Sequence, residues 1–182
     1  MKRNLAKFTT GGFFRGAHLW VEVLWVITRC LFFTTNWPFP SAFKTFLLRT
    51  FGAIIGEGLV IRAGVYIHFP WRLRIGSHVW IGEGVKILNL APVEIGSNVC
   101  ISQATYLCTG SHDYRKETFD LITKPIHIHD GAWLSASTFI APGVTIGAQS
   151  VVSAGAVVFQ DVPENVLVRG NPATVVRNLS DS

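Results

Sequence analysis

From Ile55 onward the sequence repeats with a period of six residues, which differs from the two of a flat strand and the 3.6 of an α-helix. Glycine or another turn-forming residue recurs within the repeat, as at Gly56, Gly64 and Gly155. The repeat therefore predicts very short strands joined by tight corners. Its aliphatic positions fall in groups of three: Ile55, Ile61, Ile67; Ile75, Ile81, Ile87; Ile95, Ile101, Leu107; Ile128, Leu134, Ile140; and Ile146, Val152, Val158.

The spacing between these groups indicates how the chain coils. Within a group the step is six residues, whereas Ile67 to Ile75 and Ile87 to Ile95 are steps of eight. Because the two extra residues recur at one corner, each group of three forms one coil with three sides. Five coils stacked at the spacing of neighbouring strands make a triangular prism about 24 Å long, with aliphatic side chains filling its interior.

One long excursion interrupts the prism. From Leu107 to Ile128 the step is 21 residues instead of six, so 15 extra residues leave the prism at about residues 112–127. Loops of this length are commonly functional. The excursion opens with the polar sequence TGSHDY at residues 109–114. His112 supplies an imidazole here, a group that in general is suited to serve as a catalytic base.

The N-terminal residues lack the repeat and predict two helices. The segment Leu19–Phe33 is mostly apolar, and as a helix it would be about 22 Å long, short of the roughly 30 Å needed to span a membrane. Glu22 and Arg29 lie on one side of this helix, and its other sides are apolar, including Trp20 and Trp25.

A second helix is predicted after Pro40, with Ser41 as its N-cap. A helix that starts here has one apolar face that can pack on the prism. The residues of this predicted face are Phe43, Phe46, Leu47 and Phe51.

Charge is concentrated in this N-terminal part. Residues 1–50 carry a net charge of +6, whereas residues 51–182 carry −1. Two arrangements fit: a basic amphipathic surface resting on anionic lipid, or a helical lid packed on the rest of the protein. We favour the lid, because apolar helices usually bury against their own domain.

The cysteines and the N-terminal residues indicate in which cellular compartment the protein is expected. The three cysteines form no CxxC pair and are odd in number, which argues against a disulfide framework or a thiolate zinc site. The apolar run after the basic start lacks a small-residue cleavage site. We therefore expect a cytoplasmic protein, with a peripheral contact to the inner face of the membrane through the basic N-terminal segment left open.

Several segments resemble the hexapeptide-repeat acyltransferases. They are ILNLAPVEIG, which contains Asn89, TGSHDY, AWLSASTFIAPGVTIG and the terminal GNPATVVR, and together they look like galactoside and maltose acetyltransferases. This resemblance covers residues 55–177. Over nearly the full length the chain looks closest to acetyltransferases of colanic acid and exopolysaccharide biosynthesis.

The resemblance implies a mainly β fold, a left-handed parallel β-helix of about five coils with N-terminal α-helices and one long loop excursion. Three parts are expected along the chain. Residues 1–54 form a helical cap or lid, residues 55–168 form the β-helix, and residues 169–182 form a C-terminal tail.

The resemblance also implies an O-acetyltransferase that moves an acetyl group from acetyl-CoA to a hydroxyl of a sugar or polysaccharide precursor. A homotrimer without a nucleic-acid partner is expected. His112 matches the family's general base, and Asn89 matches the side chain that holds the acceptor. Asp113 and Tyr114 are expected at the acceptor, and Asp113 or Glu117 is the candidate group that orients His112.

The donor site is expected along the last coils. Ala136 and Ala154 match family positions that contact pantetheine, chiefly through main chain. Arg177 matches a basic residue that meets the nucleotide phosphates, and Arg169 is a further local candidate, since a guanidinium suits phosphate. Trp133 is assigned either to lining this groove or to a buried packing role.

Two other functional classes are compatible with the same prism. The γ-carbonic anhydrases use the same prism and bind zinc on histidines, and His127 and His129 form an HxH pair. Alternating strand residues share one side by default, however, and no His-x4-His follows, so no metal is expected. The other alternative is a non-catalytic scaffold that has kept the fold and lost the chemistry.

Overall fold

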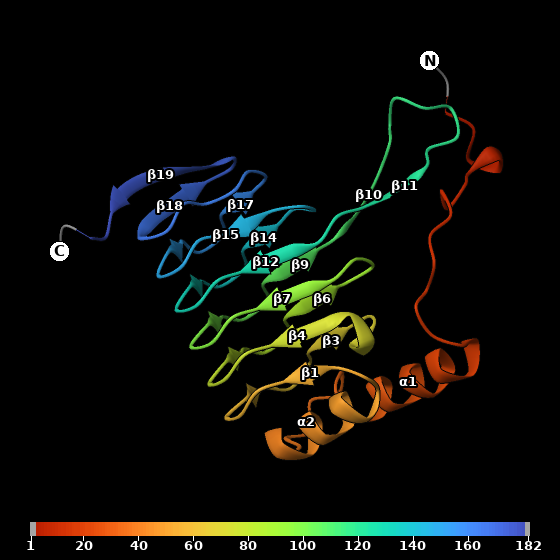
Figure 1. Ribbon diagram of the computed structural model, residues 1–182, viewed down its shortest axis with the longest axis horizontal. Coiled ribbons are helices and arrows are strands. Elements are labelled where there is room, and N and C mark those ends of the chain that lie inside the picture. The colour runs from red at the N-terminus through yellow and green to blue at the C-terminus, as the bar shows by residue number, and fades with distance from the viewer. Residues whose placement is uncertain (1–2, 181–182) are drawn as a thin grey trace.

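Short parallel strands wrap around one core to form a three-sided prism in the computed structural model, which describes residues 3–180 (Figure 1). Successive strands join successive faces, so each face is a parallel sheet with one strand per turn. The predicted parallel β-helix is therefore confirmed. There are five full turns and part of a sixth, in which Val162 bridges to Ile146 and β18 extends one sheet.

The three faces are named here sheets A, B and C. Sheet A contains β1 (Ile54–Ile55), β4 (Leu73–Ile75), β7 (Val93–Ile95), β12 (Ile126–Ile128) and β15 (Thr145–Ile146). Sheet B contains β2 (Val60–Ile61), β5 (Trp80–Ile81), β8 (Cys100–Ile101), β13 (Trp133–Leu134), β16 (Val151–Val152), β18 (Val166–Gly170) and β19 (Ala173–Asn178). Sheet C contains β3 (Tyr66–Ile67), β6 (Lys86–Leu88), β9 (Tyr106–Cys108), β14 (Phe139–Ile140) and β17 (Val157–Val158).

The last strand, β19, differs from the rest because it runs antiparallel to β18. The segment expected to be a C-terminal tail thus contributes a strand at the end of sheet B. An antiparallel strand needs only a short connection, whereas a parallel one would require another full turn of the prism.

The core follows the six-residue repeat. All fifteen predicted aliphatic positions are buried, none more than 7% exposed. A second inward position lies two residues before each of them, and there Thr105 and Thr138 share a hydroxyl hydrogen bond of 3.1 Å inside the prism. The corners use the left-handed backbone region, as at Gly58 (φ 68°), where a Cβ would lie 2.5 Å from Nδ1 of His78.

Two helices, α1 (Leu19–Phe32) and α2 (Ser41–Thr50), lie at the N-terminal end of the prism (Figure 1). The carbonyl groups of the first turn have no preceding turn to pair with, and side chains of the helices bond several of them. Trp25 donates to the Ile67 carbonyl at 3.0 Å, and Lys44 donates to the Arg62 carbonyl at 2.7 Å. The helices therefore protect the open strand edge as well as the core.

Two details of α2 were predicted incorrectly. Pro40 occupies the N-cap position, whereas Ser41 is the first helical residue and its hydroxyl accepts from the Ile61 N–H at 3.0 Å. Phe43 and Phe46 are exposed, and Lys44 and Leu48 are the buried residues of the helix. The first-turn carbonyls explain this orientation, because they require a donor and Lys44 supplies one.

The orientation of α1 is also unexpected. Its polar residues Glu22 and Arg29 are half-buried, and Trp25 is fully buried, so this stripe faces the prism. The remaining apolar sides, which include Trp20, are exposed. Within residues 3–180, no helix combines the length and apolar character needed to cross a membrane.

Two 3₁₀ turns complete the secondary structure. One, η1 (Leu5–Lys7), lies in the N-terminal segment, and the other, η2 (Pro70–Arg72), leads into β4. The segment that contains η1 runs from the helices toward the long excursion, so that Asn4 and Thr9 contact the excursion (Figure 1).

Candidate active site

The long excursion is an antiparallel hairpin, referred to below as the arm, made of β10 (Gly110–His112) and β11 (Leu121–Thr123). It leaves the prism directly after β9, slightly earlier than the sequence predicts, and projects away from sheet C (Figure 1). His112 is the last residue of β10 and pairs with Leu121 across the hairpin. A regular hairpin fixes the backbone on both sides of this imidazole.

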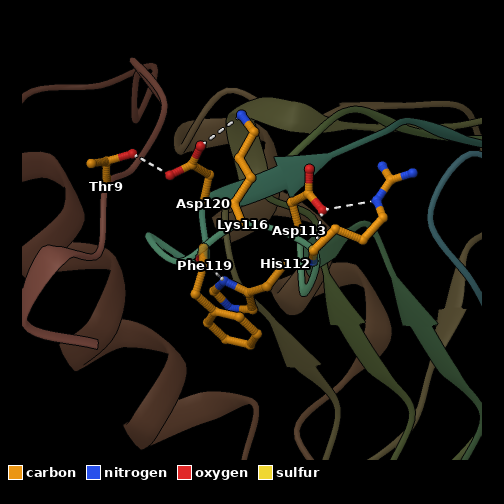
Figure 2. A network of polar contacts seen from close by, with 7 residues as sticks. Thr9, His112, Asp113, Lys116, Phe119 and Asp120 are labelled. Carbon is orange, nitrogen blue, oxygen red and sulfur yellow. Dashed lines mark hydrogen bonds and ion pairs between the residues drawn. The ribbon is translucent and has the colours of Figure 1, made fainter. Parts of the chain in front are cut away.

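The His112 ring is held on several sides (Figure 2). It stacks on Phe119 with ring centroids 4.4 Å apart and planes 5° apart, and Phe8 meets it edge-on at 5.7 Å. Its Nδ1 lies 3.1 Å from the Phe119 carbonyl oxygen. Because a carbonyl can only accept, Nδ1 must carry the proton, which leaves Nε2 with its lone pair free to act as a base.

The groups expected to orient His112 have other partners. The Asp113 carboxylate accepts from the Arg115 N–H and from Arg115 Nε, both at 3.1 Å, and these bonds lower the pKa of Asp113. Glu117 pairs with Lys7 at 2.9 Å. The suggested role of Asp113 or Glu117 was therefore wrong, and the Phe119 main chain takes it.

The arm is attached to the N-terminal segment. The Asn4 N–H donates to the Glu117 carbonyl at 2.9 Å, and the Thr9 hydroxyl donates to the Asp120 carboxylate at 2.8 Å (Figure 2). Lys116 also contacts Asp120 at 2.9 Å. Residues more than a hundred positions away in sequence thus fix the part of the chain that carries Phe119.

Hydrogen bonds from Thr118, Lys116 and Thr9 lower the pKa of the Asp120 carboxyl from an ordinary 3.8 to about 2. A folded-state pKa below the unfolded one means that Asp120 stabilises the fold above about pH 4, and that this contribution disappears as the pH falls toward 2. We expect Asp120→Asn to melt at a lower temperature than wild type at pH 7 and at the same temperature near pH 2. A melting difference that is constant across this range would contradict this role.

A groove of about 460 Å³ lies between the arm and the prism. Its polar side includes His112 together with two residues predicted at the acceptor, Asp113 and Tyr114. Its apolar side comes from the later turns of the prism, through Phe139, Ala141, Pro142 and Phe159. The arrangement places the His112 imidazole at the wall of a cleft that is apolar on the other side, as many small-molecule sites are.

Asn89 does not line this groove. It is fully buried, its Oδ1 accepts from the Phe69 N–H at 2.9 Å, and its Nδ2 donates to the Phe69 carbonyl at 2.6 Å. Both the oxygen and the nitrogen of the amide therefore hydrogen-bond to the main chain of the adjacent turn. In this arrangement the Asn89 amide links two turns of the prism, and its contact with an acceptor stays a prediction.

The residues predicted for the donor lie elsewhere on the same chain. Ala136 and Ala154 occupy the corner between sheets B and C in successive turns, with the Gly155 N–H bonded to the Ala136 carbonyl at 2.9 Å. Trp133 is on the outside of sheet B, 47% exposed, and donates to the Ser102 hydroxyl at 3.0 Å, so it has no buried packing role. Neither these residues nor the exposed Arg169 and Arg177 line the His112 groove.

The HxH pair lies on sheet A and its edge. His127 points outward and its Nδ1 is 3.3 Å from Glu94, while His129 is exposed. Across residues 3–180, no three His, Cys, Asp or Glu side chains lie close enough together to hold a metal ion.

Comparison with known proteins identifies the family. The chain is 41% identical over 175 residues to the provisionally named colanic acid biosynthesis acetyltransferase WcaF of Escherichia coli K12, with 96% of each chain covered. The chain belongs to the hexapeptide-repeat acetyltransferase family. Residues 125–160 match the hexapeptide repeat of succinyl-transferase, which corresponds to the later turns of the prism.

Two further relatives support this membership. Galactoside O-acetyltransferase of Escherichia coli K12 is 31% identical over 159 residues, covering 84% of this chain and 78% of that one. The hexapeptide-repeat acetyltransferase VCA0836 of Vibrio cholerae, solved in complex with acetyl coenzyme A, superposes with a TM-score of 0.80 at 37% identity over 96% of this chain and 97% of that chain. The enzyme class and the fold expected from the sequence are therefore confirmed.

Proposed function

We propose that this acetyltransferase moves an acetyl group from acetyl-CoA to a hydroxyl of a sugar or polysaccharide precursor, with His112 as the general base. The observation that carries this proposal is the Nδ1 contact of His112 with the Phe119 carbonyl, which leaves the lone pair on Nε2 of an imidazole that lines the groove. The complex of VCA0836 with acetyl-CoA and the kinship with galactoside and colanic acid acetyltransferases support the donor and the class of acceptor.

The reaction balances with one base and no covalent enzyme intermediate. Nε2 of His112 takes the proton of the acceptor hydroxyl while that oxygen attacks the thioester carbonyl carbon. The tetrahedral intermediate then expels the CoA thiolate, which takes a proton from the imidazolium. Stacking against Phe119 and the bond to its carbonyl hold the ring in one orientation, so little reorganisation is needed.

The donor would lie along the corner between sheets B and C. Main-chain groups at Ala136 and Ala154 would face the pantetheine, and Trp133 offers an exposed aromatic surface beside them. Arg169 and Arg177 are suited to the phosphates, because within residues 3–180 neither guanidinium is paired with a carboxylate. These donor residues lie outside the His112 groove, so a complete site would require two copies of the chain.

The outer surface of sheet B supports assembly into the proposed trimer. One residue per turn points outward there, and the parallel register aligns these residues in a single row, termed the sheet B ladder. The corresponding residues of sheet A are mainly polar, including Arg74, Glu94 and His127. An apolar row of this length is expected to be covered by another subunit. The sheet B ladder consists of Val60, Trp80, Cys100, Trp133, Val151 and Leu167.

Thiol release from acetyl-CoA tests the reaction class. The purified chain would be assayed with nucleotide sugars, simple glycosides and lipid-linked oligosaccharides, and we expect release that depends on one of these acceptors. The product should carry one added acetyl group by mass spectrometry. Failure of every acceptor would favour the scaffold alternative, whereas stoichiometric zinc together with CO₂ hydration would favour a carbonic anhydrase.

A further inference from the structure

The most exposed residues of α1 include no charged, amide or hydroxyl side chain. Eight of its fourteen residues are exposed, and all eight are apolar or cysteine. The large apolar ones are each 39–69% exposed. Such a face differs from the usual amphipathic helix, in which the exposed side is polar. The exposed residues are Leu19, Trp20, Val23, Leu24, Val26, Ile27, Cys30 and Leu31.

The contacts on the other side hold α1 in this orientation. Trp25 is buried and bonded to the Ile67 carbonyl, and Arg29 lies 3.3 Å from the same oxygen with its guanidinium 4.2 Å from the Tyr66 ring centroid. Glu22 is ion-paired with Arg15 at 2.6 Å. Rotating the helix to bury its apolar face would break all of these contacts, so the apolar face is a stable feature of the surface.

The composition of this face is less suited to contact with water or with another protein than to contact with hydrocarbon. Monomeric soluble proteins rarely expose contiguous apolar patches larger than a few hundred Å². Protein interfaces are only about 60% apolar and carry a polar rim with hydrogen bonds. In α1 the exposed face offers the Trp20 indole N–H as its one strong hydrogen-bonding group. That composition fits hydrocarbon, with a tryptophan at the polar boundary.

We propose that α1 lies in the plane of a lipid bilayer and inserts its exposed apolar face among the acyl chains. The fourteen residues of α1 span about 21 Å, which is too short to cross a bilayer and long enough to lie along its surface. The inference goes beyond acetyl transfer, because it concerns where the enzyme is held and does not depend on the acceptor.

Charge around the helices favours anionic lipid. Arg29 and Arg49 donate to main-chain carbonyls, and within residues 3–180 neither is ion-paired with a carboxylate. Glu22 is the one acidic residue between residues 3 and 50, and it is already paired with Arg15. The apolar face is therefore flanked by net positive charge, which attracts anionic headgroups.

The mode of contact differs from the electrostatic one suggested by the basic N-terminal segment. Two cations of that segment already have partners within the same chain. Lys7 pairs with Glu117, and Arg3 donates to the Tyr114 carbonyl. Apolar insertion should therefore provide most of the binding, and salt should weaken it only modestly.

Vesicle flotation with the full chain tests the proposal. The probes are vesicles containing about 30% anionic phospholipid and vesicles of neutral phospholipid alone. The test variant is Leu24→Gln/Ile27→Gln, and the matched control is Val176→Gln, which alters an equally exposed apolar residue on β19 at the other end of the prism. Thermal melting and sedimentation would accompany each flotation experiment.

We expect wild type and Val176→Gln to float with anionic vesicles, to remain bound in about 0.5 M salt, and to bind neutral vesicles less well. The double variant should bind at least about tenfold more weakly, because two large apolar groups no longer enter the acyl layer. It should keep its melting temperature, its oligomeric state and its turnover of a water-soluble acceptor.

Three results would overturn the docking proposal. They are a wild type that does not float, a double variant that floats equally well, and a double variant that changes oligomeric state, which would make this face an interface between copies. The first two of these results leave turnover of a water-soluble acceptor in place. Lack of turnover in wild type would instead contradict the proposed acetyl transfer and leave the flotation result standing.

Discussion

His112→Ala should lower the rate of acetyl transfer by about 10²- to 10⁴-fold, the range that general-base catalysis commonly supplies. Without the imidazole, the acceptor hydroxyl must attack while it still carries its proton. The loss should appear in kcat more than in the affinity for acetyl-CoA, because the predicted donor residues lie outside the His112 groove. Single-turnover thiol release with a working acceptor measures the effect directly.

His129→Ala is the matched control, since it removes an exposed imidazole at the edge of sheet A, away from the arm. It should retain wild-type turnover. Near-normal turnover by His112→Ala would eliminate His112 as the base. Equal loss in both variants would also contradict the assignment, because the effect would then not be specific to the groove.

Trp80→Glu should convert the proposed trimer to monomers and lower acetyl transfer by at least about 100-fold. Trp80 lies in the sheet B ladder and is 61% exposed in the single chain. A carboxylate at this position would have to be buried unpaired between subunits, at a cost of several kcal/mol per site. Because the donor residues and His112 occupy separate regions of one chain, separated subunits should lack a complete site even with His112 intact.

Ile54→Glu provides the control, because Ile54 is comparably exposed and points outward from sheet A in the first turn. It should remain trimeric and active. Sedimentation velocity and thiol release would be measured on the same samples. An active wild-type monomer would contradict the trimer, and a fully active trimeric Trp80→Glu would show that the sheet B ladder is not the contact between subunits.

The prism was predictable because its signal is local and redundant. Each turn repeats the same corner and the same inward positions. A misassigned residue in one repeat would therefore conflict with the pattern in all the others. The repeat therefore assigns positions such as Ile101 and Leu134 to the interior of the prism. The second inward position was missed because it admits Thr105, Thr138 and Ser150, polar residues that become internal only when their hydroxyls find partners.

The candidate site was predictable only in part. A polar TGSHDY sequence at the start of a long insertion singled out His112, which lies in the wall of a groove. The group that orients His112 carries no sequence signature, since any residue at position 119 has a carbonyl. Asn89 shows the opposite case, a suggestive side chain whose amide is fully used by the Phe69 main chain.

By itself, the sequence determined the fold and the enzyme family, and it predicted His112 as the base. These follow from residue types at regular spacing, which local geometry converts directly into strands and corners. Only the tertiary structure decided which side of each helix faces inward. The first-turn carbonyls accept hydrogen bonds from Trp25 and Lys44, and these bonds turn those two residues toward the prism. It also decided how the arm is held, because Thr9 and Asp120 meet only after the chain has closed around the prism. Contacts of that kind depend on distance in space, and no spacing along the chain encodes them.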